Sequence, residues 1–360
     1  MGDLVRRGGR VPQEPAASVI IPVLDRIDHL IPCLRSLASL EARNHEVVVV
    51  ANGTSDANLD RLPDLESLVV VRSPVNLGFG GGCNWGARVA RGRYLVVLND
   101  DTEAEPGWLE ALIAVAESDA VIGAVGSRLL DPDGTLQEAG SILWRDAGTH
   151  QVGRGLPPAS VAYDEVRDVD YCSGCGLLVK REAWDVTGGF DETFFPAYFE
   201  DVDLCLSLRS RGYRVVYAPH ARLRHFHGGS LSDDERSPIA LRNGRRFIAK
   251  WAGELSDYDP QPKTRARAEA VAAAIARAAR REVPPRALAA GVSQPNKPLT
   301  EIEALQIHAR AIAAALALDD ELIARLCQDQ VSLDRLRRAV RRVPLASRFL
   351  RWAARHPVAP

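Results

Sequence analysis

The chain has 360 residues, a hydrophobic fraction of 46% and a formal net charge of -2. Its length accommodates one large domain with an appended segment, or two domains. The nearly balanced charge excludes a broad electrostatic attraction to nucleic acid, and no apolar run is long enough for a membrane-spanning helix. The first apolar run, residues 17–24, is too short for a signal peptide, and six scattered cysteines are typical of a reducing compartment. We therefore expect a cytoplasmic protein.

The first half of the chain is predicted to form an α/β fold. Residues 1–16 are polar and are expected to be a flexible leader. Apolar, β-branched runs then alternate with helical patterns, which is typical of a mostly parallel sheet covered by helices on both faces. In such sheets ligands bind at the carboxyl ends of the strands, so the residues after positions 23, 50 and 98 are the first candidates for a site. The predicted strands are 18–23, 46–50, 68–71 and 94–98, and the predicted helices are 28–40, 84–91 and 108–117.

The second half changes in character. Past residue 130 the sequence predicts short strands and turns, and residues 150–161 are rich in Gly and Pro and are expected to form a loop. The main domain is predicted to cover residues 17–253. Residues 260–360 are rich in Ala, Arg and Leu and are expected to form an all-helical extension. The predicted strands here are 176–180 and 213–217, and the predicted helices are 203–211, 264–281, 300–327 and 333–342.

Two carboxylates follow the predicted strand 94–98, in the run Asn99, Asp100 and Asp101. Buried carboxylates are costly unless they are paired or bind a metal. Mg²⁺ and Mn²⁺ take carboxylate oxygens and keep positions open for diphosphate oxygens. A cap for a following helix is an equally good interpretation of these residues when they are considered alone.

A second acidic cluster, Glu200, Asp201 and Asp203, precedes a predicted helix and is flanked by aromatic residues. A carboxylate beside apolar rings has a raised pKa and can act as a general base. The alternative is a favourable interaction with the helix dipole, which explains one carboxylate more easily than three. Two histidines, His225 and His227, follow a strand-like run and are either metal ligands or part of a surface loop.

Two further motifs have weaker meaning. Cys172 and Cys175 have the spacing of a zinc or redox pair, but no second pair of ligands lies nearby, so we expect core cysteines. The glycines of residues 76–84 would let a backbone approach phosphate. That segment leaves a dinucleotide-dependent oxidoreductase as an alternative, although its glycine spacing departs from the dinucleotide fingerprint and the acidic clusters stay unexplained. A non-catalytic nucleotide-sugar-binding protein is the other alternative.

Taken in order, these motifs resemble the inverting family 2 glycosyltransferases, close to the rhamnosyl- and galactofuranosyl-transferase-like branch. The resemblance covers roughly residues 17–250, and each motif is short, whereas the ordered set is specific. The motifs are SVIIP at 18–22, NGTSD at 52–56, NLGF at 76–79, LNDDT at 98–102, GGFD at 188–191, YFEDVD at 198–203 and HFHGGS at 225–230.

The resemblance implies a GT-A fold, a nucleoside-diphosphate sugar as donor and Mg²⁺ or Mn²⁺ as cofactor. The acceptor would be a hydroxyl of a carbohydrate, a lipid-linked sugar or a small molecule. By the same resemblance, Asp101 and His225 would be metal ligands, and Asp201 would be the general base with Glu200 beside it. The donor-binding residues it implies are Pro22, Asn52, Asp56, Asn76, Gly78, Phe79, Asn84, Asn99 and Asp100.

The chain departs from the family pattern at Ala51, where many relatives carry an aspartate. Asn52 or Asp56 would have to replace the base contact of that carboxylate, or the donor binds differently. The carboxyl-terminal residues 335–355 interleave arginines with aliphatic and aromatic residues. Such a segment can lie on an anionic membrane, or it can pack on the preceding helices with its arginines in solvent.

Overall fold

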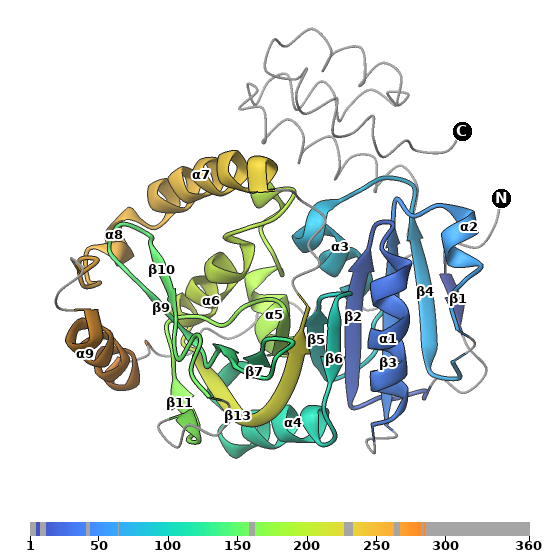
Figure 1. Ribbon diagram of the computed structural model, residues 1–360, viewed down its shortest axis with the longest axis horizontal. Coiled ribbons are helices and arrows are strands. Elements are labelled where there is room, and N and C mark those ends of the chain that lie inside the picture. Colours follow the sequence, from blue (N-terminus) through green and yellow to red (C-terminus); the bar gives the residue numbers. More distant parts are fainter. Residues whose placement is uncertain are drawn as a thin grey trace, which may run out of the picture.

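The computed structural model describes residues 5–7, 12–40, 44–63, 65–157, 163–226, 233–262, 267–281 and 284. Within them, an 11-stranded sheet has the order β1-β4-β3-β2-β5-β12-β7-β13-β11, with β6 paired to β13 and β8 paired to β7 (Figure 1). The strands are β1 Val5–Arg7, β2 Ala17–Val23, β3 His45–Asn52, β4 Leu68–Ser73, β5 Tyr94–Leu98, β6 Thr102–Ala104, β7 Ile122–Leu130, β8 Leu136–Glu138, β11 Arg167–Asp168, β12 Gly176–Lys180 and β13 Arg214–His225.

The two halves of the sheet differ in strand direction. Strands β4, β3, β2 and β5 run parallel, as the apolar runs predict. Strand β12 lies antiparallel between β5 and β7, and β13 runs parallel to β7. The predicted α/β class and mostly parallel sheet are therefore confirmed, with a mixed carboxyl half. A separate hairpin pairs β9 (Ser141–Leu143) with β10 (Thr149–Gln151), so a strand begins the predicted loop 150–161.

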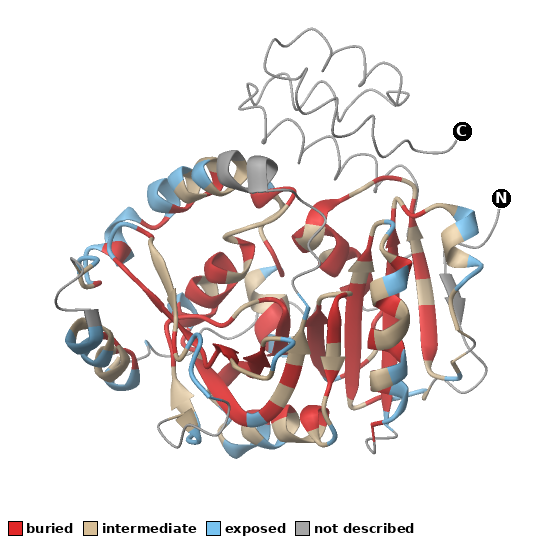
Figure 2. Ribbon diagram, in the orientation of Figure 1, coloured by how far each residue is buried: buried red, intermediate tan, exposed pale blue. Residues whose placement is uncertain are grey.

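Helices cover both faces of the sheet, which explains why β3 is buried along its whole length (Figure 2). Alternate residues belong to different cores: Val47 and Val49 pack with α1 (Ile27–Ala38) and α4 (Trp108–Ser118), whereas Val48 packs with α3 (Gly78–Ala87) and α6 (Glu200–Ser210). Because side chains of a strand alternate between faces, only a strand covered twice reads as a continuous apolar run.

Helix α3 begins inside the glycine-rich segment, six residues before the predicted start at 84, and ends at Ala87. A Cβ atom on Gly86 would lie 2.5 Å from Ile20 Cγ2, and one on Gly82 would lie 2.8 Å from Pro22 Cβ. The glycines therefore bring the helix close to β2, and this packing outweighs the low helix propensity of glycine. The predicted helix boundary was wrong because it was drawn from propensity alone.

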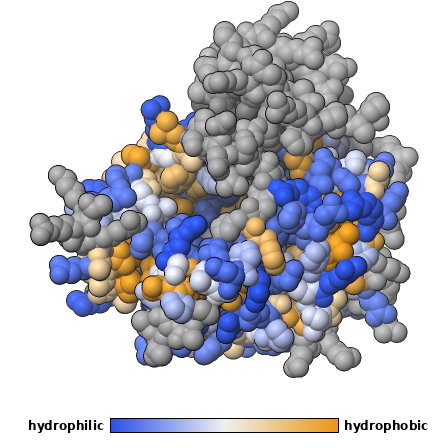
Figure 3. Space-filling model, viewed as in Figure 1, coloured by the Kyte–Doolittle hydropathy of each residue, from blue (hydrophilic) through white to orange (hydrophobic). Residues whose placement is uncertain are grey.

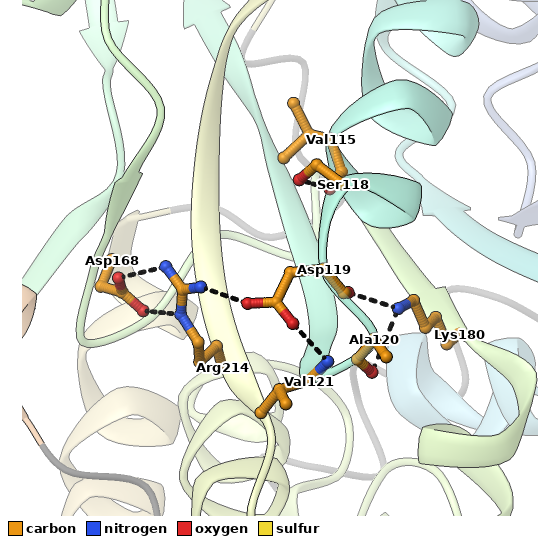
Figure 4. Close-up of polar contacts among 8 residues, drawn as sticks. All are labelled: Val115, Ser118, Asp119, Ala120, Val121, Asp168, Lys180 and Arg214. Carbon is orange, nitrogen blue, oxygen red and sulfur yellow. Dashed lines mark hydrogen bonds and ion pairs between the residues drawn. The ribbon is translucent and has the colours of Figure 1, made fainter.

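Charged contacts join the strands of the mixed half at the edge of the sheet where β7 and β13 begin. Figure 4 shows Arg214 between Asp168 and Asp119. Its Nη2 donates a hydrogen bond to Asp168 at 2.7 Å, and its Nη1 donates one to Asp119 at 2.7 Å. Lys180 Nζ donates to the Asp119 carbonyl at 2.9 Å. Since Arg214 is about one-third exposed, these pairs are expected to fix register more than to add stability.

Both predicted terminal segments contain structure that packs on the sheet domain. Val5–Arg7 pair antiparallel with β4, so the expectation of a flexible leader was wrong for these residues. After α7 (Asp233–Lys250) and α8 (Ala252–Leu255), helix α9 (Arg267–Arg280) packs Ala274 in one cluster with Ile142 and Trp144 of the β9–β10 hairpin. The remaining helices are α2 Asp56–Leu59, α5 Arg181–Thr187 and the 3₁₀ turn Glu192–Phe194.

The predicted helices 300–327 and 333–342 and the basic segment 335–355 lie outside the described residues. Among the helices that the structure describes, none has the length and apolarity needed to cross a bilayer. The surface in Figure 3 mixes hydrophilic residues with smaller groups of apolar ones.

Candidate functional site

A cleft of about 510 Å³ opens where β2, β3 and β5 end and where α3 and α6 begin. This is the edge of the sheet that the strand pattern predicts. Most of the predicted site residues line it together, although they come from distant parts of the chain. These residues are Pro22, Asn52, Asn76, Gly78, Phe79, Asn99, Asp100, Asp101, Glu200, Asp201 and His225.

Two predicted donor-binding residues are not among the residues that line the cleft. Asn84 donates from Nδ2 to the Phe190 carbonyl at 2.8 Å and accepts from the Phe190 amide at 2.9 Å, so it joins α3 to the segment before α6. Asp56 forms an ion pair with Arg72 on the surface. A contact of either residue with the donor stays a prediction.

On the wall of the cleft formed by β3 and the loop before α3, the polar side chains form hydrogen bonds within the protein. Asn52 Oδ1 accepts from the Leu77 amide at 2.7 Å, and its Nδ2 donates to the Gly78 carbonyl at 2.9 Å. Asn76 Oδ1 accepts from the Gly78 amide at 2.8 Å. The amide of Asn52 therefore fixes the loop that leads into α3. Many relatives contact the base through an aspartate at the position of Ala51. Asn52 could make that contact only if its hydrogen bonds to Leu77 and Gly78 broke.

The acidic motif and His225 meet because β6 pairs with β13, in a register that places Thr102 opposite His225. The Asp101 side chain is buried, and its Oδ1 lies 3.2 Å from His225 Nε2. Burial and the neighbouring charge of Asp101 raise the pKa of Asp100 to about 7, and Arg26 opposes this shift. Two carboxylates with one raised pKa are the electrostatic signature of a place where positive charge is needed.

The tautomer of His225 follows from its outer partners. Gln137 Nε2 donates to Asp131 Oδ1 at 2.9 Å, and a carboxylate only accepts, so Gln137 Oε1 faces His225 Nδ1 at 2.7 Å as an acceptor. Nδ1 must then carry the proton. In the neutral ring, Nε2 then keeps a lone pair, which a metal ligand requires, and it lies on the side of the ring that faces Asp101 Oδ1.

The residues present fit a divalent cation held by Asp101 and His225. No cluster of three or more His, Cys, Asp or Glu side chains suited to a metal occurs in the described part of the chain. Two protein ligands nevertheless match a hard cation that takes further oxygens from a diphosphate and water. His227, the other histidine of the motif, lies outside the described residues.

The second acidic cluster divides into different environments at the start of α6. Asp203 is buried and accepts hydrogen bonds from Trp251 Nε1 at 2.7 Å and from Lys250 Nζ at 2.9 Å, so it anchors α7. Asp201 lines the cleft and accepts from the amides of Gly174 at 3.1 Å and Val202 at 2.8 Å. The helix dipole explains part of this cluster, but it does not explain the carboxylates that face the cleft.

Burial raises the pKa of both cleft-facing acids of α6. For Glu200 the charge of Asp201 raises the pKa further, and its Oε2 accepts no hydrogen bond from the residues that the structure describes. For Asp201 the backbone amides partly offset the effect of burial. Tyr198 and Phe199, with φ of 76° and 73°, hold the backbone in the left-handed region just before these acids. Such strain is typical of functional sites.

The sequence did not identify the polar residues on the other wall. Glu138 at the end of β8, Tyr171 and Ser173 line the cleft, as do Thr149 and Gln151 of β10. Their strands are only a few residues long, so no periodicity marks which side chains face inward. Cys172 and Cys175 are buried free thiols with pKa values raised by burial, which confirms the expectation of core cysteines.

The α/β sheet and its acidic cleft define a GT-A-like enzyme class, and comparisons with known proteins name the family. Residues 18–182 match Glycosyl transferase family 2. The chain is 31% identical over 250 residues to N-acetylglucosaminyl-diphospho-decaprenol L-rhamnosyltransferase of Mycobacterium tuberculosis, covering 61% of this chain and 79% of that protein. The chain therefore belongs to glycosyl transferase family 2, which confirms the resemblance drawn from the motifs.

Other relatives are much longer than the matched region. The chain is 33% identical to the O-antigen biosynthesis protein RfbC of Myxococcus xanthus, over 68% of this chain but 20% of that protein. It is 31% identical to the uncharacterized protein y4gI of Sinorhizobium fredii, over 65% of this chain but 27% of that protein. A crystal structure of GalNAc-T7 with UDP, GalNAc and Mn²⁺ shares the fold, at a TM-score of 0.55 and 18% identity over 68% of this chain and 49% of that chain. Family membership and the packing role of the α3 glycines exclude the oxidoreductase alternative.

Proposed function

We propose that this chain is a metal-assisted, inverting glycosyltransferase that moves a hexose or deoxyhexose from a nucleoside-diphosphate sugar to a hydroxyl of a lipid-linked sugar. The observation that carries the proposal is the pairing of Asp101 with His225 in the same cleft as the partly buried carboxylate of Asp201. The name of the M. tuberculosis relative supports a deoxyhexosyl donor and a lipid diphosphate acceptor.

In this mechanism Asp101 and His225 would hold the cation, and Asp201 would act on the acceptor. When bound, the cation would neutralise the negative charge that grows on the departing diphosphate. Asp201 would take the proton of the acceptor hydroxyl as that oxygen attacks the anomeric carbon from the face opposite the diphosphate. A single displacement of this kind inverts the anomeric centre. The raised pKa of Asp201 makes it a stronger base than an ordinary aspartate.

The proposal is tested by incubating the purified chain with a panel of nucleotide-sugars and measuring release of nucleoside diphosphate, with Mn²⁺ and with EDTA. We expect at least one donor to be turned over with Mn²⁺ and none with EDTA. Addition of an N-acetylglucosaminyl diphosphate lipid should raise the rate and give a product of inverted anomeric configuration. Turnover that is equal with Mn²⁺ and EDTA would reject the metal-assisted mechanism. A product of retained configuration would reject single displacement.

A further inference from the structure

Glu138 is a buried carboxylate in the cleft that the proposed mechanism does not use. Its Oε1 accepts a hydrogen bond from the amide of Ser173 at 3.0 Å. The next amide of the chain, that of Gly174, donates to Asp201 Oδ2 at 3.1 Å. Consecutive amides of one loop therefore hold two carboxylates that come from different elements, β8 and α6.

This arrangement keeps the two carboxylates close to one another. Consecutive Cα atoms are about 3.8 Å apart, and each carboxylate is one hydrogen bond from its amide. The charge of Asp201 accordingly raises the pKa of Glu138, which burial brings to about 7. Two carboxylates held by adjacent amides on one wall of the cleft can each accept a hydrogen bond from a different hydroxyl group of one sugar ring.

The surroundings of Glu138 are suited to a sugar. Tyr171, Ser173, Thr149 and Gln151 line the same wall, and together they offer an aromatic ring, hydroxyl groups and an amide. All of them follow residue 130, where the sheet changes to mixed strands, whereas most of the donor-binding residues that the resemblance implies lie before residue 101. The wall around Glu138 is thus available to the acceptor.

A purely structural role explains Glu138 poorly. A buried carboxylate that only stabilises the fold normally has a cationic partner. Within the described residues Glu138 forms no ion pair, and the exposed Arg154 only lowers its pKa from a distance. Its Oε1 accepts from the Ser173 amide, which is a neutral group.

We propose, on the basis of the function proposed above, that Glu138 binds the acceptor hydroxyl adjacent to the one that Asp201 deprotonates. The cleft then selects acceptor sugars that carry two neighbouring free hydroxyl groups. Glu138 accepts a hydrogen bond from the second hydroxyl and orients the ring, so that the attacking oxygen faces the donor. In this role Glu138 determines acceptor binding, and Asp201 alone removes the proton.

The test compares Glu138→Gln with the unmodified chain, because glutamine keeps the size of the side chain and its carbonyl still accepts from the Ser173 amide. The matched control is Glu254→Gln, which removes an exposed carboxylate on α8. The acceptor is a synthetic N-acetylglucosaminyl diphosphate with a short prenyl chain, together with its 3-deoxy, 4-deoxy and 6-deoxy analogues. We measure KM and kcat for acceptor and donor, and donor hydrolysis without acceptor.

We expect Glu138→Gln to raise the acceptor KM about tenfold to a hundredfold, the usual range for a hydrogen bond to a charged group, with a smaller change in kcat. Donor KM and donor hydrolysis should not change. In the unmodified chain, the analogue that lacks the attacking hydroxyl should be inert. The analogue that lacks the adjacent hydroxyl should have an acceptor KM raised by about the same factor as the Glu138→Gln substitution. In Glu138→Gln, removal of the adjacent hydroxyl should no longer raise the acceptor KM.

An acceptor KM of Glu138→Gln within twofold of that of the unmodified chain would overturn the proposal. The proposal would also be overturned if removal of the adjacent hydroxyl still raised the acceptor KM of Glu138→Gln. A parallel loss of donor hydrolysis would also overturn it, since that result indicates a structural role. Failure of the proposed function is seen separately, as the absence of Mn²⁺-dependent nucleotide release by the unmodified chain.

Discussion

The two halves of the sheet contribute to the cleft in opposite ways. In the parallel half, β2 to β5, polar side chains such as Asn52 and Asn76 are bonded within the protein and shape a loop. In the mixed half, the buried Glu138 and the partly buried Asp201 are carboxylates whose pKa values are raised by burial. The β3 side of the parallel half is built for stability of shape, whereas the mixed half, like Asp100 and Asp101 after β5, holds charge at an energetic cost.

This difference indicates which substitutions in the cleft should reduce stability and which should reduce activity. Removing a polar group from the parallel half should cost stability, because its partners are left buried and unpaired. Removing a charge from the mixed half should cost activity more than stability. The predictions below can break or sharpen this contrast.

The largest effect is expected for Asp201→Asn. We expect kcat to fall about 10²- to 10⁴-fold, the usual contribution of a general base, while donor affinity stays the same because the base acts on the acceptor. Transfer rates and donor binding by calorimetry measure this, with Glu254→Gln as control. If Asp201→Asn stays active and Glu200→Gln is dead, the two acids exchange roles.

Asp101→Ala should come next. Loss of a metal ligand is expected to remove about 10²- to 10³-fold of the Mn²⁺-dependent rate, since a bound cation supplies several kcal/mol of charge stabilisation. Donor affinity in Mn²⁺ should fall towards its value in EDTA. Rates and donor affinity are measured across a Mn²⁺ titration, and Asp257→Asn, at an exposed position two residues after α8, serves as control. An unchanged metal dependence would exclude Asp101 as a ligand.

Gln137→Leu tests the tautomer of His225. We expect Mn²⁺ affinity to fall about 10- to 100-fold, because outer partners fix the orientation and protonation of a ligating histidine. Electron paramagnetic resonance of free Mn²⁺ in the presence of nucleoside diphosphate measures this without turnover. In a His225→Ala background the same change should have no further effect. An independent loss in that background would show that Gln137 acts by another route.

Asn52→Ala tests the parallel half. The substitution leaves the Leu77 amide and the Gly78 carbonyl without their partner, so we expect a loss of about 1–3 kcal/mol in the free energy of unfolding. Urea denaturation measures this loss, and Asp201→Asn measured beside it should cost less, because asparagine keeps one of the two acceptors that the Gly174 and Val202 amides use. A larger loss for Asp201→Asn than for Asn52→Ala would break the contrast between the halves.

The smallest effect concerns pH. Since burial raises the pKa of Asp201, the base is protonated at pH values where an ordinary aspartate, with a pKa of about 3.9, is already charged. Activity should therefore increase with pH through an acidic limb that lies above that value. A profile of kcat against pH measures the limb. A plateau that extends down to the ordinary range would contradict the assignment of the base.

The sequence by itself determined the fold class and most of the cleft. Strands β2, β3 and β5 are buried on both faces, so their apolar runs identify them, and the carboxyl ends of parallel strands must meet at one edge. This rule predicted the position of the motif around Asp101, and the family resemblance added Asp201 to the same site. The order of the motifs along the chain also identified the family.

Only the tertiary structure decided which polar groups form hydrogen bonds within the protein and which face the cleft. Helix α3 starts at Gly78 because close packing on β2 overrides propensity, and Asn84 forms hydrogen bonds with the backbone of Phe190. Gln137 and Glu138 lie on a three-residue strand, whose role depends on contacts with His225 and Ser173 from distant elements. A local pattern cannot encode such contacts, because they form only when separate elements pack together.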